Sequence, residues 1–157
     1  EPPMSAAEQR EVFESILEDT LGAGCSIEVA QAIHDQLSSQ IREHKESKSA
    51  EPLIMTAGEI GKVLLACGVT EENVAAFQAQ CGERFGVGAV LDPANLIDPG
   101  KYEVKTAQAT IQVDPEFSYA VTTRVIDGRA YLLLPADDIQ VNGLPIQVTN
   151  GQETETI

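Results

Sequence analysis

The chain has 157 residues, 43% of them hydrophobic and 22% charged, which is typical of one ordinary globular domain with a core of its own. Its 25 acidic and 10 basic residues give a formal net charge of −15. Such a charge repels phosphate backbones and anionic lipid, so nucleic-acid binding and membrane association are disfavoured. No apolar run approaches the roughly 18 residues that a membrane-spanning helix requires.

Two helices are predicted in the first 50 residues. Ser5 and Glu8 form a capping box for the first helix, which ends at Gly22, and Ser26 caps the second. From residue 42 to 52 the apolar periodicity is lost, which indicates a fraying helix end, a linker and a subdomain boundary. The two inward stripes are Val12, Phe13, Ile16, Leu17 and Leu21, and Val29, Ala30, Ile33, Leu37 and Ile41.

A second helical pair is predicted before residue 86. Thr56 and Glu59 form its capping box, Gly68 suits a left-handed C-cap, and Thr70 caps the next helix. The only cation of that last helix is Arg84, so a structural hairpin is favoured over a DNA-reading helix-turn-helix. The inward residues are Ile60, Val63, Leu64 and Cys67, and then Val74, Phe77, Cys81 and Phe85.

Beyond a loop from residue 86 to 100, in which Asp92-Pro93 begins one helical turn, the period changes from helix to strand. Short strands are predicted at residues 102–105 and 109–113. Asp127-Gly128 between residues 119–126 and 129–134 indicates a hairpin with a two-residue turn, and Asn142-Gly143 indicates another. Pro145 then marks a sheet edge.

The first hairpin has two unequal faces. The turn pairs Arg124 with Tyr131 and Thr123 with Leu132. In this register the guanidinium of Arg124 can lie against the ring of Tyr131. One face is expected to lie on the core, and it carries Val121, Thr123, Val125, Ala130, Leu132 and Leu134. The other face is half polar, so either the helices cover it or it is a contact surface. We call its residues Arg124, Arg129, Tyr131 and Leu133 the interaction face.

No catalytic, metal or cofactor site is predicted. The three cysteines, an odd and widely spaced set, are interpreted as small core side chains and favour an intracellular protein. His34 and His44 are ten residues apart on a polar helical segment, which indicates solvated side chains rather than a ligand pair. The remaining acidic candidates are interpreted as solvated loop carboxylates: Glu116, Asp127, Asp137 and Asp138. No dinucleotide, P-loop or nucleophile motif is present.

These patterns together predict an α+β fold, with about four N-terminal helices packed on a C-terminal antiparallel sheet of hairpins. The expected parts are a helical hairpin at 1–50, a second helical pair and loop at 53–100, β hairpins at 101–148 and a disordered tail at 149–157. One domain containing all of them is an alternative.

Two stretches resemble an uncharacterised Firmicutes family catalogued as a domain of unknown function. They are TIQVDPEFSYAVTTRVIDGRAYLLLPADDIQVNGLPIQV at 110–148 and GEIGKVLLACGVTEENVAAF at 58–77. The shared features include TRVIDGR, the VNG turn and the CGV junction. The resemblance implies the C-terminal part of a bacterial, cytoplasmic protein, and it assigns no catalytic residue. The start at Glu1-Pro2-Pro3 also fits a fragment.

The favoured function is therefore a non-catalytic interaction or regulatory module, which engages a protein partner or a second copy of itself. The alternative is an enzyme, or an enzyme's accessory domain, with a pocket between the helical and strand-rich parts. No cofactor is expected in the first case.

Overall fold

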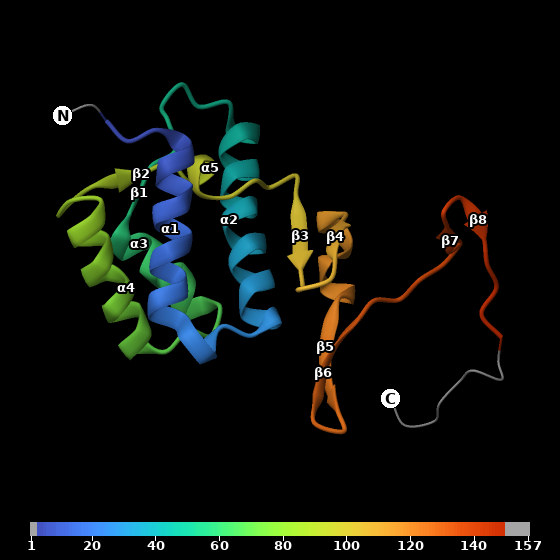
Figure 1. Cartoon of the computed structure of the whole chain (residues 1–157). Coiled ribbons are helices and arrows are strands. Elements are labelled where there is room, and N and C mark those ends of the chain that lie inside the picture. The colour runs from blue at the N-terminus through green and yellow to red at the C-terminus, as the bar shows by residue number, and fades with distance from the viewer. Residues whose placement is uncertain (1–2, 150–157) are drawn as a thin grey trace. The chain divides into compact units, whose positions relative to one another are not determined.

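The computed structural model describes residues 3–149 and has the predicted α+β fold, with helices in the N-terminal half and small antiparallel hairpins in the C-terminal half (Figure 1). It forms two compact units, an N-terminal unit of residues 1–119 and a C-terminal unit of residues 120–157. The predicted tail at 149–157 lies outside the described residues except for its first member.

The helices of the N-terminal unit begin where their caps predict. Both capping boxes form, and Ser26 and Thr70 each accept a hydrogen bond from a first-turn amide. The bounds are α1 Ala6–Leu21, α2 Ile27–Ser47, α3 Ala57–Ala66, α4 Glu71–Arg84 and the single turn α5 Pro93–Leu96, with a 3-10 turn at Gly22–Gly24.

The segment predicted to be a helix end and a linker, residues 42–52, contains both, because no helical residue follows Ser47, the last residue of α2, before Ala57. The last turns of α2 lack apolar periodicity, but His44 and Lys45 suit the negative end of the helix dipole. Lys48 ends the helix in the left-handed region at φ 55°. Local capping therefore sustains the helix where burial does not.

The junction between α3 and α4 is a Schellman motif. Gly68, at φ 100°, takes the left-handed position, its N–H donates to the Leu65 carbonyl, and the Val69 N–H donates to the Leu64 carbonyl. This tight turn lays α3 against α4, which confirms the structural helical hairpin.

The core of the N-terminal unit is built around α4, which packs on both α1 and α3 (Figure 1). Phe13 and Phe77 meet edge to face with ring centroids 6.1 Å apart. All four predicted stripes contribute, and the buried members are Phe13, Ile16, Leu21, Ile33, Leu37, Met55, Ile60, Leu64, Val69, Val74, Phe77, Cys81, Leu91 and Leu96. Val12, Leu17 and Phe85 pack at its margin.

Two small sheets complete the N-terminal unit. The strands β3 Tyr102–Lys105 and β4 Thr110–Val113 pair as a hairpin, close to the predicted bounds. The strands β1 Met55–Thr56 and β2 Val90–Leu91 pair although their partner residues are 34 and 36 positions apart in the chain. Sequence periodicity missed them because each strand has only two residues. A 3-10 helix at Pro115–Ala120 follows β4.

In its described residues, 120–149, the C-terminal unit contains two separate two-stranded hairpins. They are β5 Thr122–Ile126 with β6 Arg129–Leu133, and β7 Gln140–Val141 with β8 Leu144–Pro145. The predicted register is confirmed for Arg124 with Tyr131 and for Thr123 with Leu132. Both strands of each hairpin are edges, including the strand that carries Pro145.

The expectation that one face of β5–β6 lies on a core is wrong. Val125 and Leu134 are 70% and 46% exposed, and Val121 is the single buried residue between 120 and 149. No third strand joins this hairpin among the described residues.

Candidate functional site

The interaction face is positioned by the turn of the β5–β6 hairpin. Asp127 and Gly128 both have positive φ, 50° and 78°, as a type I′ turn requires. That turn fixes the register, so Arg124 lies opposite Tyr131, and Ile126 lies opposite Arg129. Because side chains alternate along strands, these residues share one face with Leu133.

The residues of the interaction face are accessible. The side chains of Arg124 and Arg129 are exposed, Tyr131 is 44% exposed, and Leu133 is half-buried. Between residues 3 and 149 neither guanidinium makes a salt bridge, and the expected contact of Arg124 with the Tyr131 ring is not formed. Within the described part of the C-terminal unit no strand or helix covers this face, so its groups are available to another molecule.

The edges of this hairpin are as open as its face. Residues that flank a two-residue turn exchange hydrogen bonds, so Ile126 and Arg129 form such a pair and the pattern alternates from there. The amides and carbonyls of Ala130 and Leu132 therefore point away from β5, and those of Thr123 and Val125 point away from β6. The sheet has two strands, so neither row has a strand partner in the described part of the chain.

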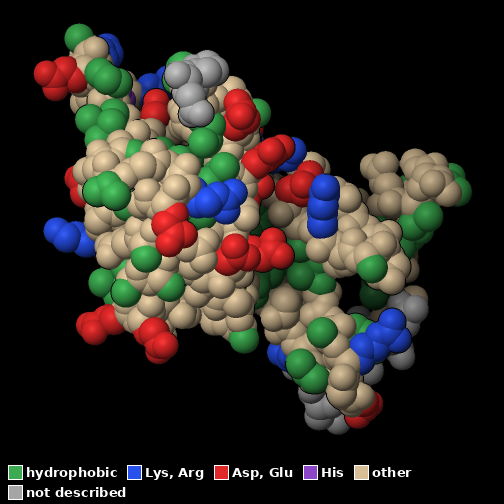
Figure 2. All heavy atoms as spheres, turned by 60° about the vertical axis from the view of Figure 1, so that its left-hand side comes forward, with side chains coloured by type: hydrophobic (Ala, Val, Ile, Leu, Met, Phe, Trp, Pro, Cys, Tyr) green, Lys and Arg blue, Asp and Glu red, His purple; other side chains and the backbone are tan. Residues whose placement is uncertain are grey.

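The charge of the hairpin differs from that of the rest of the chain. Residues 121–134 contain two arginines and one aspartate, whereas the whole chain carries −15. Figure 2 shows acidic side chains scattered over the visible face rather than gathered in one patch. The interaction face thus combines cationic, aromatic and aliphatic groups, a composition that is common at protein interfaces.

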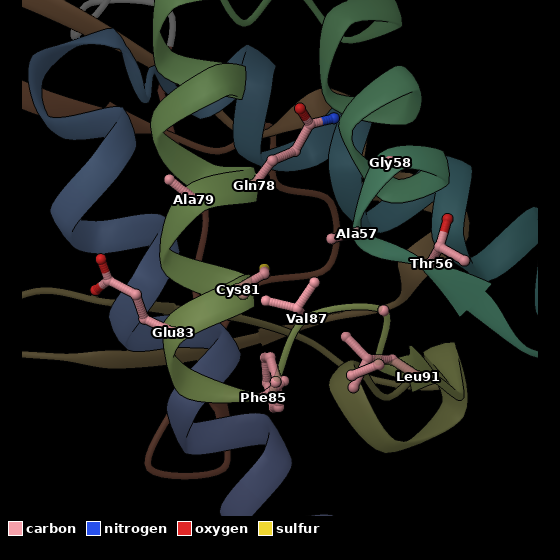
Figure 3. A pocket seen from close by; sticks show the side chains of 14 residues that line it. Thr56, Ala57, Gly58, Gln78, Ala79, Cys81, Glu83, Phe85, Val87 and Leu91 are labelled. Carbon is pink, nitrogen blue, oxygen red and sulfur yellow. The ribbon is translucent and has the colours of Figure 1, made fainter.

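The N-terminal unit contains an apolar pocket of about 430 Å³. It lies between the first turn of α3, the second half of α4 and the loop at residues 86–89 (Figure 3). Cys81 and Gln78 point from α4 toward α3 and this loop, whereas Glu83 points away. Phe85, Val87 and Leu91 make the lining mainly apolar. Shape and lining suit an apolar group, and no acid–base pair faces it.

The thiols of Cys67 and Cys81 are poor nucleophiles. Burial raises the pKa of Cys81 to about 11, and partial burial raises the pKa of Cys67, so both thiols stay protonated at neutral pH. Cys81 is buried as predicted and Cys67 is half-buried, but Cys25 is exposed, which corrects its assignment to the core. Across residues 3–149 no three His, Cys, Asp or Glu side chains gather as a metal site.

The two histidines are bonded rather than solvated, which corrects the sequence-based interpretation. His34 Nε2 lies 3.0 Å from the Asp98 carbonyl and 2.9 Å from that of Lys101. Carbonyls only accept, so Nε2 carries a proton, and Nδ1 lies 3.5 Å from Ser38 Oγ, within hydrogen-bond distance. His44 Nε2 lies 2.7 Å from the Glu51 carbonyl.

The His34 cluster is a second candidate site that the sequence reasoning missed. Besides its bonds, the ring of His34 packs edge to face on Tyr102, with centroids 5.6 Å apart. His34 lines two hollows of about 500 and 550 Å³, and the second also reaches Ser38 and Arg42. The local signal was the spacing of His34 and Ser38 by four residues, but the other partners are more than 60 residues away in the chain.

The structure shows an α+β fold with an exposed hairpin, and its described part holds no metal cluster. These features define a class of fold, but they do not identify an activity. A family model described as a domain of unknown function, DUF4317, matches residues 1–144, and the chain therefore belongs to this family. The match includes residues 1–50, which lie outside the two stretches that carry the resemblance. No curated protein and no solved structure matches the chain. No helix between residues 3 and 149 is long and apolar enough to cross a bilayer.

Proposed function

We propose that the chain is a non-catalytic protein-interaction or regulatory module of a bacterial cytoplasmic protein, and that it binds protein through the β5–β6 hairpin. The observation that carries the proposal is that the interaction face and both strand edges are open. Arginine and tyrosine are the residues that most often dominate binding energy at interfaces.

Physical reasons for a partner come from the hairpin itself. A single two-stranded hairpin is marginally stable in water, and further strands or a packed face are needed to stabilise it. An added strand would bond to the outward amides of β6, which is the β-augmentation mode of recognition. The exposed thiol of Cys25 supports a reducing compartment, where thiols stay unpaired.

Photo-cross-linking inside bacterial cells tests this proposal. Tyr131 is replaced by benzoylphenylalanine, and Leu65 on α3 is the matched control because the two side chains are 44% and 42% exposed. We expect protein adducts of discrete mass from position 131 and much weaker adducts from position 65. Equal adduct yields at the two positions, or none at either, would contradict the proposal.

An enzymatic role is the second candidate, and the specific observation in its favour is the His34–Ser38 pair beside a hollow of about 550 Å³. A hydroxyl bonded to an imidazole is the arrangement of an activated nucleophile. Ser38 is only 2% exposed, which weighs against attack on a substrate. A fluorophosphonate probe decides the matter: an enzyme is labelled at Ser38 and loses the label in Ser38→Ala, whereas an interaction module is not labelled.

A further inference from the structure

We propose that the partner of the hairpin is a second copy of this chain, bound by antiparallel pairing of β6 with β6 about a two-fold axis at Tyr131. This inference rests on the proposed function, because it takes the β5–β6 hairpin as the binding element. It adds the identity of the partner, the strand that binds and the register.

The backbone of β6 permits this pairing. The outward groups of β6 belong to Ala130 and Leu132, which flank Tyr131 symmetrically. With Tyr131 on the axis, Ala130 of each copy lies opposite Leu132 of the other, and each such pair exchanges two hydrogen bonds. Tyr131 then faces Tyr131 in a non-hydrogen-bonded pair, where side chains approach most closely.

Side-chain charge distinguishes β6 from the other edge. The equivalent pairing of β5 through Thr123 and Val125 centres on Arg124 and sets two guanidinium groups opposite each other, which is unfavourable. In the β6 pairing Arg129 lies opposite Leu133 of the second copy, and the two aromatic rings meet at the centre. The β6 edge is therefore the one that accepts a second copy.

The resulting sheet has four strands in the order β5, β6, β6, β5. Its mixed face brings the Tyr131 and Leu133 side chains of both copies together in the middle and leaves Arg124 on the outer strands. A sheet needs three or more strands with an apolar face to be stable on its own, and the four-stranded sheet meets this requirement whereas the isolated hairpin does not. Tyr131 is exposed and Leu133 is half-buried in the monomer, and in the dimer the side chains of the two copies bury each other.

The low net charge of the hairpin favours it as the place where two copies meet. Each chain carries −15, so two copies repel each other over most of their surfaces. Residues 121–134 carry two arginines against one aspartate, so they are the stretch where two acidic chains approach with least repulsion. Added salt screens the remaining repulsion, and we expect it to strengthen the dimer.

Disulfide trapping tests the register in the full chain. In a Cys25→Ser background, Tyr131→Cys places two thiols in the central pair, and Arg124→Cys is the matched control on the neighbouring strand. Oxidation is expected to convert most of the Tyr131→Cys chain into a covalent dimer, at least several-fold more than the Arg124→Cys chain. Equal yields from the two variants would overturn the proposed register.

Light scattering on purified variants provides the second measurement. Leu132→Pro removes an outward amide of β6, and Thr123→Pro removes an outward amide of β5; neither removes a hydrogen bond within the hairpin. We expect the unchanged chain and Thr123→Pro to have twice the monomer mass and Leu132→Pro to have the monomer mass. Helical circular dichroism confirms that the N-terminal unit of each variant is folded, and Thr123→Pro controls for the effect of a proline on the hairpin itself.

The two proposals fail in different ways. If position 131 forms adducts with other proteins but Tyr131→Cys gives no covalent dimer and the chain is monomeric at high salt, self-pairing is wrong and the interaction module stands. If position 131 forms no protein adducts at all, both are wrong.

Discussion

At the scale of single residues, His34 links α2 to the turn before β3. Its one Nε2 proton is shared by two carbonyls, and its ring lies against Tyr102. We expect His34→Ala to lower the free energy of unfolding by about 1–2 kcal/mol, because the hydrogen bonds and the ring contact are lost together. His44→Ala, which removes one exposed bond, should cost only about 0.5 kcal/mol. Urea unfolding measures both, and equal losses would contradict the assignment.

The thiols give a prediction about pH. Burial raises the pKa of Cys81 from its ordinary value to about 11, so the folded chain keeps this proton at a pH where the unfolded chain loses it. The contribution of Cys81 is complete below pH 9 and is lost as the pH rises toward 11. We expect the free energy of unfolding to fall more steeply over this range in the unchanged chain than in Cys81→Ala. Parallel pH profiles would contradict this.

Residues also show where sequence reasoning works. Ser5 and Thr56 were predicted as caps because their partners, Glu8 and Glu59, are three residues away, and both boxes form. The bonds of His34 were missed because Asp98 and Lys101 are 64 and 67 residues away. Periodicity places a side chain on a helix face but does not indicate which distant loop covers it.

At the scale of elements, α3 packs tightly on α4 at Gly61. A Cβ added there would overlap the Gln78 amide and lie 3.0 Å from Val74 Cγ1. We expect Gly61→Val to lower the free energy of unfolding by about 1–3 kcal/mol, as for overpacked cores, despite the better helix propensity of valine. Gly58→Ala on the same helix meets its nearest atom at 3.7 Å and should be neutral or stabilising. Thermal unfolding of the two variants checks this.

The β5–β6 hairpin shows which features the local sequence predicts and which depend on distant parts of the chain. The Asp127-Gly128 turn fixes its register locally, and the structure has that register. The side that faces a core depends on what else is available to pack, so alternation alone led to a buried face that the structure does not have. The interaction face remains a prediction, and its residues are positioned by the same turn.

At the scale of the whole molecule, the two units differ in how they are stabilised. Every member of the core cluster lies between Phe13 and Leu96, so the N-terminal unit contains a core without help from the hairpins. Only Val121 is buried between residues 120 and 149. The C-terminal unit is thus the part of the chain with the least internal stabilisation and the most exposed apolar side chains.

Truncation tests this division. A chain of residues 1–119 keeps the whole core cluster and the bonds of His34, so we expect it to unfold cooperatively with a free energy within about 1 kcal/mol of the complete chain. A chain of residues 1–99 loses Tyr102 and the Lys101 carbonyl, and it should be less stable by about 2 kcal/mol or more. Urea unfolding followed by helical circular dichroism measures the three chains. A broad, uncooperative transition for residues 1–119 would show that the hairpins contribute to the core, and the strands would then be structural supports rather than surfaces left open for a partner.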